Sequence, residues 1–222
     1  MIDASTHATA AHQYLRSVVV LDDDLLPELG EDHEGDQSVL RGQQEFVSAF
    51  ASSGLIAMPA VPTWSATDPD ATQRFEEVGW LCGRADVIVL DWDMPNPDGD
   101  DGAGETAVRL IRLLTEPPNA TLRLIVIYSR GVRDGIAARL DAELGTANNG
   151  GFWTKGPASV AVIRKAGGIS DPDRDEEDPA SSIEELPERL TSLFDSIISG
   201  IVPSTVVTAL AASRNRAGGI IS

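Results

Sequence analysis

The sequence predicts a doubly wound α/β fold: a five-stranded parallel sheet in the order 2-1-3-4-5, with helices on both faces and extra helices at the C-terminal end. Two observations predict it. Apolar runs rich in β-branched residues alternate with helical patterns along the chain, which is typical of βα repeats around a parallel sheet. The runs are also continuous, as in strands buried on both faces. Right-handed crossovers leave few strand orders, and this one is the most economical.

The first expected strand, residues 17–21, runs directly into three adjacent acids, Asp22, Asp23 and Asp24. Adjacent carboxylates repel one another, and close packing raises their pKa values unless a cation intervenes. A hard divalent ion with oxygen ligands is the natural partner for such a group. The alternative is a helix N-cap followed by a solvated acidic loop.

A helix and an edge strand come next. Residues 37–53 carry apolar side chains along one stripe, which predicts a helix that ends at Gly54. Residues 55–62 predict a strand, and two prolines within it place that strand at an edge of the sheet. A second helix is expected over residues 71–83.

The third expected strand, residues 86–91, ends on Asp91, and the chain then turns because Pro95, Pro97 and Gly99 cannot continue the strand. A carboxylate at the C-terminal end of a central parallel strand lies where open α/β sheets bind ligands. Its burial costs free energy unless a cation or a hydrogen-bond donor meets it there. The alternative is a strand that simply ends in a capping aspartate.

The βα pattern repeats twice more after Asp91, beginning with an acidic, glycine-rich loop at residues 98–104. The expected elements are a helix over 105–114, a strand over 122–129 that ends on Ser129, a helix over 132–144, and a strand over 151–155 that ends on Lys155. Residues 159–164 alternate weakly, and either an extra strand or the start of a helix fits them.

Side chains suited to phosphoryl chemistry follow the expected strands. In a doubly wound sheet the C-terminal strand ends converge on one edge, which would bring together Asp22, Asp23, Asp91, Ser129 and Lys155. Three carboxylates, a hydroxyl and an ammonium suit a magnesium ion and a phosphoryl group. Asp91 can act as a nucleophile that forms an acyl phosphate, with the metal and Lys155 neutralising charge. Ser129 could donate a hydrogen bond to a phosphoryl oxygen.

Two of these residues have a plainer explanation when taken singly. Ser129 alone is more often a turn residue at a strand end, and Lys155 alone is more often a surface lysine. Their joint placement with the acids, in this order along the chain, favours the phosphoryl site.

The segment from Asp91 to Gly99, Asp-Trp-Asp-Met-Pro-Asn-Pro-Asp-Gly, resembles the region around the phosphoacceptor of receiver domains in two-component response regulators. The likeness covers roughly residues 16–165. The resemblance implies a flavodoxin-like fold and a signalling role in which Asp91 accepts phosphate from a histidine kinase or a phosphotransfer protein.

The resemblance also implies roles for individual residues. Asp22 and Asp23 would hold Mg2+ together with Asp91, and the main-chain carbonyl of Asp93 would be a further ligand. Three more positions match family residues: Ser129 the switch Ser/Thr, Lys155 the invariant lysine, and Phe152 the switch aromatic.

The sequence departs from the family pattern at several places, which indicates an atypical receiver. The family usually has proline directly after its lysine, whereas Gly156 follows Lys155 and Pro157 comes one residue later. Arg130 stands where the family prefers a small residue, and residues 100–104 form an insertion beside the expected site.

The receiver domain is expected to span residues 16–200, with an acidic insertion at about 168–180. The insertion is rich in Asp, Glu and Pro, which is typical of a solvated loop or linker. A helix over 181–199 would be the fifth helix of the receiver. Residues 201–222 predict a helical extension, which could dock on the domain, form a homodimer contact or lead into an effector region.

Composition excludes several classes of function. The formal net charge is -18 and the pI about 4.3, which argues against nucleic-acid binding because phosphate neutralisation needs basic patches. A single cysteine, Cys82, rules out an intrachain disulfide. The sequence shows neither a secretory signal nor the run of roughly 18 apolar residues that a membrane span needs. We therefore expect a cytoplasmic protein with no membrane contact.

Three functions are compatible with these patterns. The first is a phosphoacceptor receiver, which is not an enzyme and whose chemistry is limited to its own autophosphorylation and autodephosphorylation. The second is a pseudo-receiver that binds a partner without taking phosphate. The third is a phosphohydrolase of the haloacid dehalogenase type, because Asp91-Trp92-Asp93 is also an acid-x-acid motif after a strand. Further acids follow the motif in that family but precede it here, so chain order favours the receiver.

Overall fold

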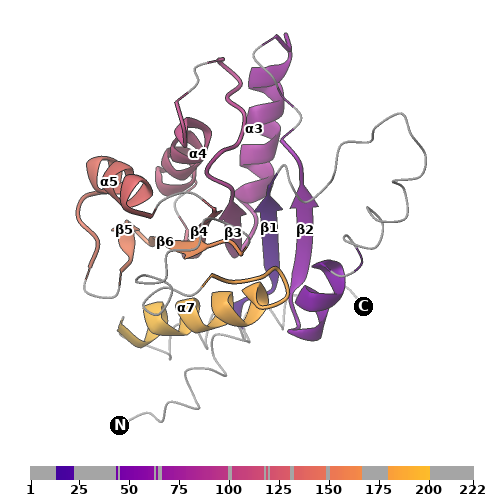
Figure 1. Cartoon of the computed structure of the whole chain (residues 1–222), viewed down its shortest axis with the longest axis vertical. Helices are drawn as coiled ribbons and strands as arrows, with labels where there is room; N and C mark the ends of the chain where they lie inside the picture. The colour runs from indigo at the N-terminus through magenta and orange to yellow at the C-terminus, as the bar shows by residue number, and fades with distance from the viewer. Residues whose placement is uncertain are drawn as a thin grey trace.

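A computed structural model describes residues 14–22, 44, 46–62, 64, 67–99, 102–117, 119, 121–130, 133–148, 151–166 and 180–200. It confirms the predicted α/β fold, with a central sheet that carries helices on both faces (Figure 1). Within these residues the sheet has six strands, in place of the five expected. No helix in the described part of the chain is long and apolar enough to cross a membrane.

The sheet keeps the predicted order except at one edge, where a strand is added. Every neighbouring pair is parallel except the last, which is antiparallel. The strands are β1 (Ser17–Leu21), β2 (Ile56–Ala60), β3 (Val87–Leu90), β4 (Arg123–Ser129), β5 (Trp153–Lys155) and β6 (Ala158–Arg164), in the order β2-β1-β3-β4-β6-β5. β2 lies at the edge that its prolines predicted.

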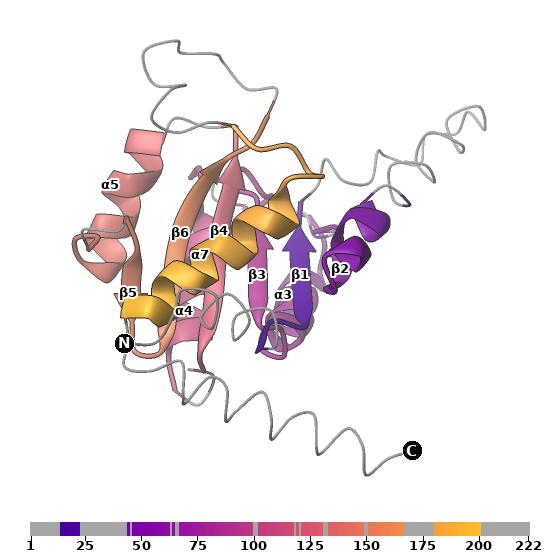
Figure 2. The same cartoon turned by 90° about the horizontal axis from the view of Figure 1, so that it is seen from below.

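The helices divide between the two faces of the sheet, as a doubly wound fold requires. They are α3 (Ala71–Cys82), α4 (Glu105–Thr115), α5 (Arg133–Leu144) and α7 (Leu186–Gly200), and residues 46–52 are also helical. α7 lies across one face (Figure 2), and it shares a hydrophobic cluster with the helical residues 46–52. α3, α4 and α5 cover the other face.

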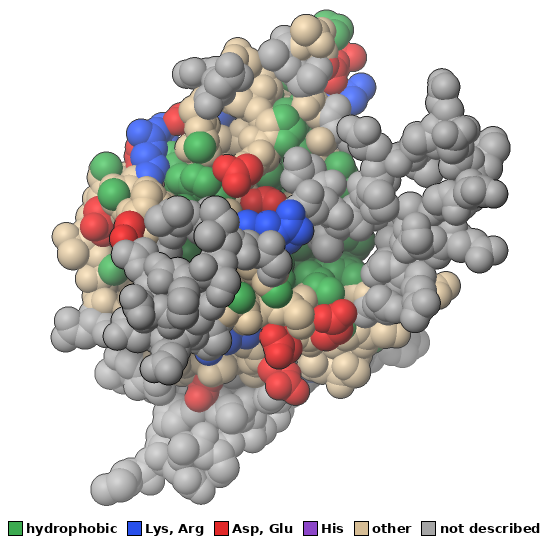
Figure 3. Space-filling model, viewed as in Figure 1, with side chains coloured by type: hydrophobic (Ala, Val, Ile, Leu, Met, Phe, Trp, Pro, Cys, Tyr) green, Lys and Arg blue, Asp and Glu red, His purple; other side chains and the backbone are tan. Residues whose placement is uncertain are grey.

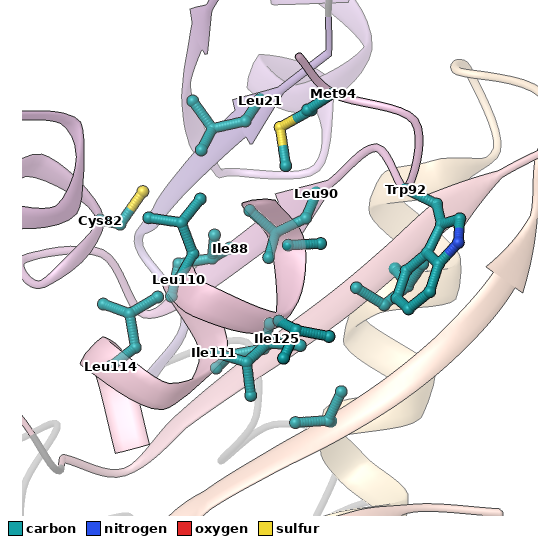
Figure 4. Packing of buried hydrophobic residues seen from close by; sticks show 14 of the residues in the cluster. Leu21, Cys82, Ile88, Leu90, Trp92, Met94, Leu110, Ile111, Leu114 and Ile125 are labelled. Atoms are coloured by element: carbon teal, nitrogen blue, oxygen red, sulfur yellow. The ribbon is translucent and has the colours of Figure 1, made fainter. Parts of the chain in front are cut away.

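Successive residues of the central strands alternate between two hydrophobic clusters. Val87 and Val89 of β3 belong to the cluster under α7, whereas Ile88 and Leu90 pack with α4 on the opposite face (Figure 4). All four residues of β3 are buried. Helices cover both sides of this strand, which explains why its apolar run is continuous.

The added strand corrects the predicted fifth strand. Residues 151–155 do contain a strand, but β5 is the outer arm of a hairpin, and the fifth parallel strand is β6. Lys155 pairs with Ala158, so Gly156 and Pro157 make the turn. Gly156 has φ +61°, a conformation that two-residue hairpin turns place at their first central position and that favours glycine.

Two buried charged side chains tie strands together at the end of the sheet opposite the expected site. A carboxylate oxygen of Asp86 accepts hydrogen bonds from the main-chain N–H groups of Arg16 (3.0 Å) and Ser17 (3.1 Å), which joins the start of β1 to the start of β3. The guanidinium of Arg123 donates to the carbonyls of Cys82 (3.2 Å) and Gly83 (3.1 Å), which joins β4 to the C-terminal end of α3.

The last strand is joined to the region before α7 by a short pairing. Ser181 donates its main-chain N–H to Arg164 and accepts one from Ala166, at 2.9 and 3.0 Å. This pairing uses the first residues of the predicted helix 181–199, so α7 begins only at Leu186. The core of the acidic insertion, residues 167–179, and the predicted extension 201–222 lie outside the described residues.

The surface carries charges of both signs. In the space-filling view, acidic and basic side chains lie next to one another near the middle of one face, with hydrophobic side chains around them (Figure 3). Large hydrophobic side chains that are exposed among the described residues are Val47, Ile56, Met58 and Trp80.

Candidate functional site

Three charged side chains meet at the C-terminal edge of the sheet, and all three are buried. Asp22 follows β1, Asp91 follows β3 and Lys165 follows β6; their exposed fractions are 1%, 6% and 8%. The Lys165 ammonium lies 2.9 and 2.8 Å from the two carboxylate oxygens of Asp22 and 3.5 Å from Oδ2 of Asp91. The lysine therefore bridges the two acids.

Strand register brings these residues together. Leu21 pairs with Leu90, and the Asp91 N–H donates to the Leu21 carbonyl at 2.8 Å, so the acids that follow the two strands are neighbours. On the other side, the main-chain N–H of Lys165 donates to the Ser129 carbonyl at 2.9 Å. Each of these residues is the last of its strand or the first after it, so parallel pairing delivers them all to one edge.

Lys155 does not reach this edge, and its predicted place beside the acids is wrong. β5 runs antiparallel to β6, so its C-terminal end lies at the opposite edge of the sheet. The Lys155 ammonium is 3.7 Å from a carboxylate oxygen of Glu116, and its side chain is 38% exposed. The residue that sequence reasoning missed is Lys165, although it follows an apolar strand just as Asp22 and Asp91 do.

Phe152 is also displaced from its predicted neighbourhood. It precedes β5 and is buried in the cluster under α7, while the next residue, Trp153, pairs with Val160 near the start of β6. The aromatic side chain beside the lysine is Tyr128, whose ring centroid is 5.8 Å from the Lys165 ammonium. Burial raises the pKa of Tyr128 above its ordinary value, and the nearby Asp22 carboxylate adds to this effect.

Ser129 lies at the end of β4 and Asp93 lies in the loop after β3, whereas Asp23 lies outside the described residues. Ser129 is the buried last residue of β4 and contacts the main chain of Lys165. Asp93 is two residues beyond Asp91, and its main-chain N–H donates to Oδ1 of Asp91 at 3.3 Å. The loop after β3 thus turns back over the acid that precedes it.

The donor set fits a magnesium ion. The described residues contain no group of three or more His, Cys, Asp or Glu side chains that could hold a metal. Mg2+ does not need such a group, because it binds through one or two carboxylates and completes its shell with carbonyl oxygens and water. Asp22 and Asp91 supply two carboxylates across the space that the Lys165 ammonium enters.

The comparisons with known proteins agree with this architecture. A family model described as a response receiver domain matches residues 14–157. The matched segment contains Asp22, Asp91 and Ser129, and it stops at the hairpin turn before β6 and Lys165. Neither the curated proteins nor the solved structures gave a match. Because the match covers more than half of the chain, the chain belongs to the response receiver domain family.

Proposed function

We propose that this protein is the phosphoacceptor receiver of a two-component system, phosphorylated on Asp91 in the presence of Mg2+. One observation carries the proposal: a buried lysine bridges two buried aspartates at the C-terminal edge of the sheet. Burying two acids and a base is costly. The burial of these three charges is explained if the site binds a cation and a phosphoryl group.

The chemistry assigns a distinct task to each side chain. A carboxylate oxygen of Asp91 attacks the phosphorus of a phosphohistidine on a histidine kinase or a phosphotransfer protein. The O–P bond of an acyl phosphate forms as the N–P bond breaks, and the imidazole leaves with its electron pair and takes up a proton. Asp22, Asp91 and the Asp93 carbonyl would hold the metal, which supplies charge neutralisation for the transferred group.

Lys165 takes the role that the resemblance gave to Lys155. Its ammonium already lies 3.5 Å from Asp91, so it can pair with a phosphoryl oxygen once Asp91 carries one. Ser129, at the end of β4, would donate its hydroxyl to another phosphoryl oxygen. Such contacts can bias a two-state surface and so pass the signal on.

The proposal has further parts. The chemistry is limited to phosphorylation and dephosphorylation of the protein itself, with no turnover of a separate substrate, and the setting is the cytoplasm. The pairing of Asp22, Asp91 and Lys165 supports a competent site over a pseudo-receiver, because a module that only binds a partner has no need to bury these three charges.

Intact-mass spectrometry with a small phosphodonor tests the proposal. The protein is incubated with acetyl phosphate and Mg2+, and the variants Asp91→Asn and Asp70→Asn are treated in parallel. Asp70 is the control because its side chain is exposed just before α3 and it is not one of the site residues. Wild type and Asp70→Asn should gain one phosphoryl group and Asp91→Asn should gain none. A phosphoryl group on Asp91→Asn would overturn the proposal. So would a folded wild type that gains no phosphoryl group and whose tryptophan fluorescence responds neither to Mg2+ nor to beryllofluoride, a mimic of the acyl phosphate.

A further inference from the structure

The loop that follows Asp91 is anchored on both sides of Asp93. Trp92 is buried, and its ring lies so close to Gly104 that a Cβ atom there would be 2.1 Å from the Trp92 Cζ2 atom. Met94 is buried in the core with Leu21 and Leu90 (Figure 4). Asp93 has an exposed side chain. The main chain at Asp93 therefore runs between two residues whose side chains are packed in the interior.

The next residue, Pro95, is held by its carbonyl oxygen. This oxygen accepts a hydrogen bond from Nε1 of Trp64 at 2.7 Å and another from the Thr106 hydroxyl at 2.8 Å. Trp64 and Thr106 are 2% and 1% exposed. Trp64 precedes α3 and Thr106 lies in the first turn of α4, so the carbonyl is hydrogen-bonded to two different parts of the fold. We call this pair of donors the Pro95 clamp.

Further contacts hold the Pro95 clamp against α3 and α4. The Trp64 ring meets Phe75 of α3 edge-on, with ring centroids 5.8 Å apart. The Arg109 guanidinium lies 4.4 Å from the centre of the same Phe75 ring and donates to Asp98, further along the loop, at 2.6 Å. Both ends of the loop are therefore fixed to α3 and α4.

We infer that Trp64 and Thr106 are positioning residues for the magnesium site. By fixing the Pro95 carbonyl they fix the direction of the Asp93 carbonyl, two residues earlier, relative to the carboxylates of Asp22 and Asp91. Mg2+ requires nearly ideal octahedral geometry, so a small rotation of one ligand weakens binding. Groups that hold a site in place act through such restraint without touching the ligand. The inference rests on the proposed function.

Helix α4 provides a matched pair of threonines for the test. The Thr106 hydroxyl donates to the loop, whereas the hydroxyl of Thr115, also buried, donates at 2.8 Å to Ile111 within its own helix. Thr106→Val and Thr115→Val each remove one buried hydroxyl from the same helix. Thr106→Ser keeps the hydroxyl, and Trp64→Phe removes the other donor of the clamp.

Isothermal titration calorimetry of the full chain with Mg2+ alone, together with urea unfolding of each variant, separates positioning from stability. Thr106→Val and Trp64→Phe should each weaken the Mg2+ Kd about fivefold, the factor that corresponds to one hydrogen bond. Thr106→Ser should retain most of the affinity and Thr115→Val all of it, even though Thr115→Val loses a similar amount of stability.

Two results would overturn the inference. One is an unchanged Mg2+ Kd in Thr106→Val and Trp64→Phe while the wild type binds Mg2+ and is phosphorylated, which would leave the proposed function intact. The other is an equal loss of affinity in Thr115→Val, which would show that general destabilisation is the cause. A wild type that binds no Mg2+ and takes no phosphoryl group would overturn the inference and the proposed function together.

Discussion

Replacing Lys165 with methionine should destabilise the protein strongly, because it leaves two buried carboxylates without the cation between them. The Lys165 side chain is 10% exposed and lies 2.8 Å from Asp22 and 3.5 Å from Asp91. Removing one member of a buried ion pair typically costs about 3–5 kcal/mol. Methionine keeps the length and the apolar stem of the side chain, so most of the loss comes from the missing charge.

Lys155→Met is the matched control, since Lys155 is the lysine that the sequence pattern predicts at the site. Its partner Glu116 is 60% exposed and 3.7 Å away. Exposed ion pairs of this kind contribute roughly 0–1 kcal/mol. The two lysine variants should therefore differ in stability by at least about 2 kcal/mol.

Urea unfolding at neutral pH without divalent ions measures this difference. With a denaturant slope of about 2 kcal/mol/M, the midpoint of Lys165→Met should fall by about 1.5–2.5 M and that of Lys155→Met by less than about 0.5 M. Millimolar Mg2+ should restore part of the loss in Lys165→Met, because a divalent cation can take the place of the ammonium between the carboxylates. Equal midpoints for the two variants, or a larger loss in Lys155→Met, would refute the assignment of Lys165.

Two further predictions concern buried positions: Cys82, at the end of the sheet opposite the site, and Gly104, whose neighbour Trp92 lies in the loop after Asp91. Burial raises the pKa of the Cys82 thiol to about 12 from 9.0, so its contribution to folding is complete below about pH 9 and is lost as the pH rises toward 12. The difference in unfolding free energy between wild type and Cys82→Ala should thus shrink from pH 8 to pH 10.5 in urea titrations, and a constant difference would contradict this. Gly104→Ala should cost about 1–3 kcal/mol and alter the emission of Trp92, because Gly104 has φ +79° and an added methyl would overlap that ring; an unchanged thermal midpoint and spectrum would count against it.

The sequence carried enough information to predict the fold and part of the site. A strand such as β3, buried on both faces, must be apolar at every position, so its run of Val, Ile and Leu was readable without a structure. The polar residue at which such a strand stops marks the edge of the sheet. Asp22, Asp91 and Ser129 were found in this way, and all three lie at that edge.

The lysine could not be assigned in the same way, because β5 ends on one lysine and β6 is followed by another. Residues 151–155 and 158–165 both contain a strand that runs to a lysine, and the direction of each strand in the sheet decides which lysine reaches the acids. The Gly156-Pro157 sequence departs from the family pattern because it forms the turn of a hairpin. A hairpin reverses the strand direction, so the first lysine is carried to the wrong edge.

The Pro95 clamp was invisible in the sequence for a different reason. Trp64 and Thr106 are 31 and 11 positions away from Pro95 along the chain. Neither belongs to a motif with fixed spacing, and a tryptophan or a threonine near the start of a helix has many possible partners. Contacts of this kind depend on how loops settle between helices, which local periodicity does not encode.

The pairing of Ser181 with Arg164 and Ala166 holds the two ends of the acidic segment next to each other beside β6. The distance between these ends is set by the pairing and does not depend on how many residues lie between them. Doubling the length of a loop whose ends are joined adds only about 0.6 kcal/mol of closure entropy. Its sequence can therefore be shortened, lengthened or exchanged for a recognition tag while β6 and α7 keep their places. Whatever is inserted there is attached one residue away from the lysine that faces Asp22 and Asp91.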